Sequence, residues 1–376
     1  MRLVTTHKIE PGMLLAVDVY TTAQRSLPYV RAGVRLEEHH RSSLLAAGVE
    51  GVYVEDAVSA GIEVTPAISE STRAEATRAL SRAFAELALR PVEGRSLPAA
   101  ALAEMRAAVK LICQDLEDAD RAALALTDLG SADAYTLQHS IDVATLGLLI
   151  ARRHFRDFGR PAPRGERRFD GIQQHLGKLG VGLLLHDIGK LALPSAILKK
   201  PGRLSDEELA IMREHPMLGV RLMEPDVIGP LAKSVIRWHH ERWDGNGYPD
   251  GRRQLEVPEF ARIAAVADVF DAVTSARVYS PAAPPHVGVQ AILEGIGSAF
   301  DPAIVASFRK VVAPYPAGSE IPLADGSSGI VVSVPLHQLD KPRVRLLWDP
   351  QGRPFQEPTE IDLREFPTLM PRLEAA

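Results

Sequence analysis

The sequence predicts a mainly α protein: a central helical bundle, a β-containing N-terminal domain and a small C-terminal β appendage. Apolar residues recur at helical spacing through the middle of the chain, short β-type runs occupy the first 65 residues, and a Pro- and Gly-rich tail follows residue 314. We therefore expect an accessory or regulatory domain at 1–125, a helical domain that carries the chemistry at 126–312, and a β-rich extension at 313–376.

Composition limits the class of protein. The chain has 376 residues, 46% hydrophobic and 24% charged, which is typical of a globular protein. A formal net charge of −5 argues against a general nucleic-acid binder or a ligand of acidic membranes. The single cysteine, Cys113, excludes an intrachain disulfide and a Cys-rich zinc site. With no signal-peptide pattern and no apolar run of membrane-spanning length, we expect a cytoplasmic protein that binds neither nucleic acid nor membrane.

The N-terminal segment reads as strands followed by helices. The runs Met13–Val17 and Gly51–Val54 follow turn-forming Pro and Gly residues and predict strands. Two apolar stripes at spacings of three and four then predict helices. They consist of Ala76, Leu80, Phe84 and Leu87, and of Leu102, Met105, Val109, Ile112 and Leu116.

Helix follows helix between residues 131 and 312. Ser205, with Glu208 three residues later, forms a capping box that predicts a helix start. Glu259–Ser275 contains neither Pro nor Gly and is rich in alanine, which favours one uninterrupted helix. In the tail, the runs Gly329–Val334 and Arg343–Trp348 predict two strands of the appendage.

Two motifs in the helical segment pair histidine with another polar group. His186 and Asp187 follow an apolar run, where burying a charged pair is costly unless a metal ion or another charge compensates it. For this dipeptide alone, a capped helix end with a solvated pair is the simpler interpretation. His239 and His240 precede the turn-forming stretch DGNGYPDG, and neighbours on a helix point about 100° apart. They suit ligands of two adjacent metals, or histidines that complement the dipole of a helix end.

Further candidates lie on the same helices. His139 sits on an apolar stripe, where a lone histidine is usually a core residue, and His215 ends the capping-box helix. Asp268 and Asp271 share one helix face beside alanines that leave room for an ion or ligand. Together these nitrogen and oxygen donors suit Fe, Mn or Zn held in a bundle core. Two such ions suit an in-line displacement at phosphorus.

The order of these motifs resembles the HD-GYP subgroup of HD-domain phosphohydrolases over about residues 131–312. The matching pieces are His139-Ser140, His186–Lys190, His215-Pro216, His239–Pro249 and Asp268–Ser275. Members of this subgroup are bacterial signal-transduction enzymes that hydrolyse cyclic di-GMP to linear pGpG and, in some cases, to GMP. The resemblance implies a metal-dependent phosphodiesterase with two divalent ions, Fe or Mn.

The resemblance also implies a role for each matching residue. The metal ligands would be His139, His186, Asp187, His215, His239, His240 and Asp268. Asp187, bridging the ions, and Lys190, beside a phosphate oxygen or the leaving group, would be catalytic. The substrate-binding residues would be Lys190, Asp244, Gly247, Tyr248, Pro249 and Arg277. Glu241 is expected to support the ligands rather than to be one.

The chain departs from the subgroup at three places. Tyr135 replaces a glutamate that supplies a third metal in some members, so we expect two ions. Ser280 replaces a basic residue that would grip phosphate. The segment 155–175 is longer than usual and reads as a basic, Pro- and Gly-rich loop, either a solvated surface loop or a source of replacement cations.

Two other functions stay open at this stage. The chain could be a catalytically weak sensor of cyclic di-GMP or an interaction module, or it could hydrolyse another cyclic dinucleotide. A protein partner such as a diguanylate cyclase, and a homodimer, are compatible with each alternative. An assay of turnover separates an enzyme from a sensor.

Overall fold

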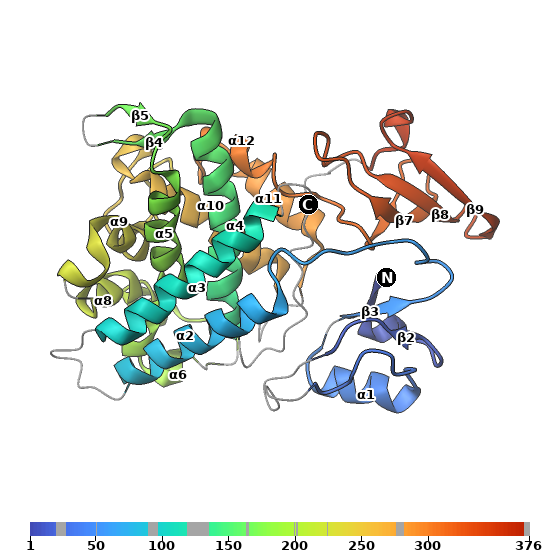
Figure 1. The fold of residues 1–376 in the computed structure, drawn as a ribbon, viewed down its shortest axis with the longest axis horizontal. Coiled ribbons are helices and arrows are strands. Elements are labelled where there is room, and N and C mark those ends of the chain that lie inside the picture. The colour runs from blue at the N-terminus through green and yellow to red at the C-terminus, as the bar shows by residue number, and fades with distance from the viewer. Residues whose placement is uncertain are drawn as a thin grey trace.

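The computed structural model describes residues 1–19, 28–49, 51–88, 97–118, 135–162, 165–198, 200, 202–223, 225–275 and 282–371. It confirms the predicted fold class, because a helical bundle makes up the middle of the chain and small antiparallel sheets lie at both ends (Figure 1). None of the helices within these residues combines the length and apolarity needed to cross a bilayer.

The helical bundle is built on one continuous apolar core. Its largest fully buried side chains include Leu80, Met105, Phe155 and Phe260. In chain order its helices and 3-10 turns are α2 (Glu70–Ala88), α3 (Ala99–Asp118), α4 (Tyr135–Phe158), α5 (Ile172–Leu184), η4 (Ile188–Ala192), α6 (Ser195–Leu198), α7 (Asp206–Met212), α8 (His215–Arg221), α9 (Pro225–Trp238), η5 (Gln254–Glu256), α10 (Glu259–Thr274), α11 (Pro285–Glu294) and α12 (Pro302–Phe308).

The predicted helices form as their sequence patterns indicate. The apolar stripes of α2 and α3 are buried, apart from the partly buried Phe84, and both helices pack against the bundle. The side chain of Ser205 accepts a hydrogen bond from the Glu208 amide, and the Glu208 carboxylate accepts one from the Ser205 amide, so the predicted capping box begins α7. Whether 1–125 acts as a separate accessory domain stays a prediction.

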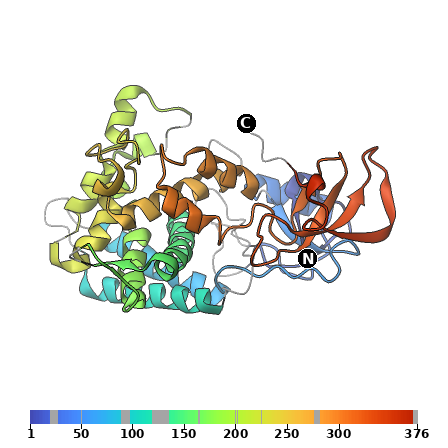
Figure 2. The same ribbon diagram turned by 90° about the horizontal axis from the view of Figure 1, so that it is seen from above.

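The two β parts of the chain lie side by side at one end of the molecule (Figures 1 and 2). The backbone N–H of Leu3 donates to the carbonyl of Gly318 at 2.9 Å, and Arg345 donates to the carbonyl of Val58 at 2.6 Å. Ile62 and Ile330 share one small apolar core. The elements are β1 (Arg2–Thr5), η1 (Thr6–Lys8), β2 (Leu14–Leu15), α1 (Glu38–Ala46) and β3 (Gly51–Glu55), and β6 (Glu320–Pro322), β7 (Ser328–Ser333), β8 (Arg343–Trp348), β9 (Pro354–Asp362) and η6 (Pro367–Leu369). Their sheets have the orders β1-β3-β2 and β6-β7-β8-β9.

The segment 155–175 is not simply a loop, which corrects the sequence prediction. Helix α4 continues to Phe158, and the strands β4 (Arg160–Pro161) and β5 (Arg167–Arg168) then pair as a short hairpin. The guanidinium of Arg167 donates to Glu259 at 2.7 Å, and the same carboxylate lies 3.1 Å from the imidazole of His154. Arg167, one of the basic residues of this segment, therefore anchors the hairpin to the start of α10.

Candidate metal centre

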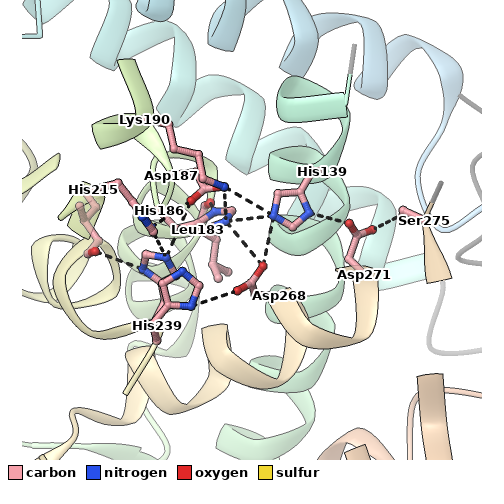
Figure 3. A network of polar contacts seen from close by, with 12 residues as sticks. His139, Leu183, His186, Asp187, Lys190, His215, His239, Asp268, Asp271 and Ser275 are labelled. Carbon is pink, nitrogen blue, oxygen red and sulfur yellow. Dashed lines mark hydrogen bonds and ion pairs between the residues drawn. The ribbon is translucent and has the colours of Figure 1, made fainter. Parts of the chain in front are cut away.

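The structure brings together all seven residues predicted as metal ligands (Figure 3). They come from five places in the bundle. Two of these places lie within the helices α4 and α10, and the other three lie at the ends of helices. His139 lies in α4, His186 and Asp187 follow α5, His215 begins α8, His239 and His240 follow α9, and Asp268 lies in α10. Helix ends can aim side chains at one point while their backbones remain in the packed bundle.

These side chains form two groups that meet at Asp187. Its Oδ1 lies 3.3 Å from Nε2 of His215 and 3.9 Å from Nε2 of His239. Its Oδ2 lies 3.5 Å from Nε2 of His186 and 3.7 Å from Nε2 of His139. The groups whose ligand atoms all lie within 4.8 Å of one another are Asp187, His215, His239 and His240, and His139, His186 and Asp268. Each oxygen of one carboxylate therefore faces a different group.

Hydrogen bonds at the far ring nitrogens orient the imidazoles. Three of them place Nδ1 against a backbone carbonyl of the preceding turn, which leaves Nε2 facing the cluster. His186 meets Leu183 at 2.8 Å, His215 meets Met212 at 2.8 Å, and His239 meets Val235 at 3.0 Å. This pattern fixes the tautomer that has its lone pair on Nε2, so that in these three histidines Nε2 is free to bind a metal.

Burial keeps most of these histidines neutral. Burial lowers the pKa of four imidazoles, those of His186, His215, His239 and His240. The pKa of His240 falls to about 4. Neutral imidazoles bind a metal without first losing a proton.

The carboxylates behave in the opposite way. Burial works to raise the pKa of Asp187, but the Lys190 ammonium and the surrounding histidines hold it well below its usual range. Burial likewise works to lower the pKa of His139, yet the hydrogen bonds that its imidazole donates to the carboxylates of Asp268 and Asp271 raise it to about 10. The centre thus combines ionised carboxylates with imidazoles inside an apolar bundle.

These residues fit divalent metal ions. Asp187 Oδ1 is buried and has no hydrogen-bond donor among the residues that the structure describes, although it faces two imidazole nitrogens. A buried anionic oxygen without a partner is costly, and a cation between it and the imidazoles would remove that cost. Nitrogen and oxygen donors without thiolate suit Fe, Mn or Zn.

The loop Glu241–Arg252, which we call the GYP loop, closes against the centre. The carboxylate of Glu241 accepts the backbone N–H of Asp250 at 2.8 Å and of Arg252 at 3.0 Å. A Cβ on Gly247 would lie 2.4–2.6 Å from backbone atoms of residues 240–242, so glycine is required there. The ring of Tyr248 stacks on His240 with centroids 4.7 Å apart. Glu241 therefore holds the shape of the loop through backbone amides, and its support of the ligands stays a prediction.

The predicted substrate-binding residues differ in whether they contact the metal centre. Lys190 forms an ion pair with Asp187 Oδ2, at the centre. Asp244 instead pairs with Arg242 at 3.0 Å, and the hydrogen bond from that arginine lowers the Asp244 pKa to about 2. Gly247, Tyr248 and Pro249 lie in the GYP loop, with a cis peptide bond between the last two. Arg277 and Ser280, and the side chain of Tyr135, lie outside the described residues.

The resemblance assigned no role to two residues near the centre, although the sequence already placed Asp271 on one helix face with Asp268. Asp271 receives Nδ1 of His139 at 2.6 Å, and its spacing from Asp268 was the signal that could have identified it. The guanidinium carbon of Arg213, two residues before His215, lies 5.5 Å from the ring centroid of Tyr248. No pattern in the chain pointed to that contact.

The fold and the clustered side chains define an HD domain. The family model of the HD domain matches residues 173–304, which hold six of the seven clustered residues. The match shows that residues 173–304 form an HD domain, and the relatives described next agree with the resemblance.

The chain is similar to several curated bacterial proteins. It is 36% identical over 233 residues to a cyclic di-GMP phosphodiesterase of Pseudomonas aeruginosa, which covers 62% of this chain and 52% of that protein. A cyclic di-GMP phosphodiesterase of Vibrio cholerae is 42% identical over 134 residues, 34% of this chain and 27% of its own. A 3'3'-cGAMP-specific phosphodiesterase of Vibrio cholerae is 44% identical over 97 residues, 25% and 19% of the two chains. The chain thus spans about half, or less, of these relatives.

Proposed function

We propose that this protein is a phosphodiesterase that uses two divalent ions, Fe or Mn, to hydrolyse cyclic di-GMP to linear pGpG, and in part to GMP. The observation that carries the proposal is the position of Asp187, whose two oxygens face two separate groups of imidazoles. The similarity to two cyclic di-GMP phosphodiesterases supports the choice of substrate.

The clustered residues would divide between two ions. His139, His186 and Asp268 would hold one, His215, His239 and His240 the other, and Asp187 would bind both. Two ions held in this way polarise a phosphodiester and supply a nucleophile at neutral pH.

The remaining residues act on the substrate directly. Lys190, whose side chain is 30% exposed, now has Asp187 as its partner. The Lys190 ammonium would hold a phosphate oxygen of the substrate and stabilise negative charge that develops there. Tyr248 stacks on His240, and Arg213 lies over the Tyr248 ring. These two side chains would contact a base or a second phosphate of the same substrate.

The same proposal includes the expected setting of the enzyme. It acts in the cytoplasm in second-messenger signalling, with 126–312 as the catalytic domain, 1–125 as an accessory domain and 313–376 as an extension. Helix α2 of the accessory segment contacts η4, and its Arg73 pairs with Asp142 of α4 at 2.9 Å. An input to the N-terminal part would therefore reach the elements that carry Lys190 and His139.

The proposal is tested by turnover of cyclic di-GMP. The full chain is loaded anaerobically with Fe²⁺ or Mn²⁺, and products are identified by chromatography. We expect linear pGpG from the parent and none from Asp187→Ala, which also loses metal; the matched control Asp206→Ala, an exposed acid at the start of α7, keeps both. Robust turnover by Asp187→Ala would overturn the ligand assignment.

A second candidate substrate is a mixed cyclic dinucleotide. The 44% identity over 97 residues to the 3'3'-cGAMP-specific enzyme favours it. Competition between cyclic di-GMP and 3'3'-cGAMP in one reaction decides the order of preference. Tight binding of either without hydrolysis by the metal-loaded chain would instead identify a sensor.

A further inference from the structure

One histidine of the centre is oriented differently from its neighbours. His186, His215 and His239 place Nδ1 against backbone carbonyls, which are neutral acceptors. His139 instead places Nδ1 2.6 Å from Oδ2 of Asp271. Within the described residues, it is the one imidazole of this set held by a carboxylate through its far nitrogen (Figure 3).

Asp271 is itself held in place. It is 5% exposed, and its Oδ1 accepts a hydrogen bond from the hydroxyl of Ser275 at 3.0 Å. The backbone N–H of Ser275 also donates to the carbonyl of Asp271 at 2.8 Å, at the end of α10. Turning the carboxylate away from His139 would therefore also break its hydrogen bond with the Ser275 hydroxyl, which the end of α10 holds in place.

Negative charge is distributed unequally over the two groups. Around His139 lie Asp271, Asp268 Oδ1 at 3.2 Å and Asp187 Oδ2 at 3.7 Å. Among the described residues, the imidazoles of the His215 group meet two carboxylates, Asp187 Oδ1 at 3.3 Å from His215 and Asp268 Oδ2 at 3.7 Å from His240, whereas His139 alone meets three. A carboxylate that accepts the far N–H of a ligating imidazole makes that ligand more basic and fixes its orientation.

We propose that Asp271 is a positioning residue that makes the two metal positions unequal, so that the position of His139, His186 and Asp268 binds its ion more tightly. This inference rests on the proposed two-ion centre. It predicts that the ions bind in order, and that a preparation short of metal holds one ion at the His139 position while the His215 position stays empty and catalysis is absent.

The experiment measures stepwise Mn²⁺ affinity in the full chain by competition with a fluorescent chelator. The variant Asp271→Asn keeps the shape of the side chain and removes its charge. We expect two distinct binding steps in the parent, and in Asp271→Asn a loss of about 10- to 100-fold in the tighter step with the weaker step unchanged. The control Asp206→Asn, an exposed acid of α7, leaves both steps as in the parent.

Ser275→Ala supplies a second, milder test. It removes the hydroxyl that anchors Asp271 while leaving its charge, so it should weaken the tighter step by a smaller factor, and it decides the matter if Asp271→Asn does not fold. Equal weakening of both steps, or no change in either, would overturn the inference while the parent still binds two ions. A parent that binds fewer than two ions would instead contradict the proposed function, and the inference with it.

Discussion

Replacing Gly189 with alanine should push apart η4, which contains Gly189, and α8, which begins with His215. A Cβ on Gly189 would lie 1.9 Å from the carbonyl oxygen of His215 and 2.5 Å from the backbone nitrogen of Gly219. Ordinary Cβ contacts begin at 3.4 Å, so η4 and α8 have to move apart by more than 1 Å. Overpacking of an interior costs about 1–3 kcal/mol, and because backbone atoms cannot rotate away, we expect the upper end, about 3 kcal/mol.

The same movement withdraws His215 from Asp187, which is 3.3 Å away at Oδ1. We therefore expect Gly189→Ala to lower the free energy of unfolding in urea and also to lose metal from the His215 position, with the His139 position retained. The matched control is Gly177→Ala in α5, where a Cβ would meet no atom within 4 Å. It should be as stable as the parent or more stable by about 0.5–1 kcal/mol, because alanine favours a helix. Parent-like stability and metal content in Gly189→Ala would refute this reasoning.

Three further predictions concern other parts of the domain. In steady-state kinetics, Arg213→Gln should raise the KM for the cyclic dinucleotide about tenfold, equivalent to roughly 1.4 kcal/mol, with little change in kcat. The control Arg221→Gln, on α8, should leave both KM and kcat unchanged. Burial works to raise the pKa of Glu259, but hydrogen bonds from His154 and Arg167 hold it below its usual range. The ionised carboxylate therefore stabilises the fold at pH values above its usual pKa, and this contribution is lost as the pH falls through the lowered pKa. Thermal unfolding from about pH 6 to pH 3 should therefore lose part of its acid dependence in Glu259→Gln, and an unchanged acid limb would contradict the anchor. Finally, a chelator should lower the Tm of the metal-loaded protein toward that of the metal-free chain, and an identical Tm would show that the folded state binds no metal.

Local patterns predicted the elements and the clustered residues. The capping box of Ser205, the apolar stripes of the helices and the Pro- and Gly-free run of α10 each depend on neighbours within a few residues, and the structure has these elements. The clustered residues could be named because each lies in a short motif. Their grouping around Asp187 follows from the fold that those motifs share.

Contacts between distant segments could not be predicted in this way. Asp271 lies 132 residues from His139, so its hydrogen bond depends on how α10 crosses α4. The β parts at the two ends of the chain meet through contacts such as Lys8 with Glu320, 312 residues apart. The hairpin after α4 has the composition of a loop, so the sequence predicts a loop there. The hydrogen bond from Arg167 to the buried Glu259 holds the segment against α10 instead. Such outcomes depend on packing and on charge pairing that a linear pattern does not contain.

The most direct test of the two-ion centre is an anomalous difference map from crystals of the full chain loaded with Mn²⁺. The account predicts two peaks about 3.5–4 Å apart, one beside His139 and His186 and one beside His215 and His239, with Asp187 touching both. A single peak, or a pair of peaks that does not share Asp187, would contradict it.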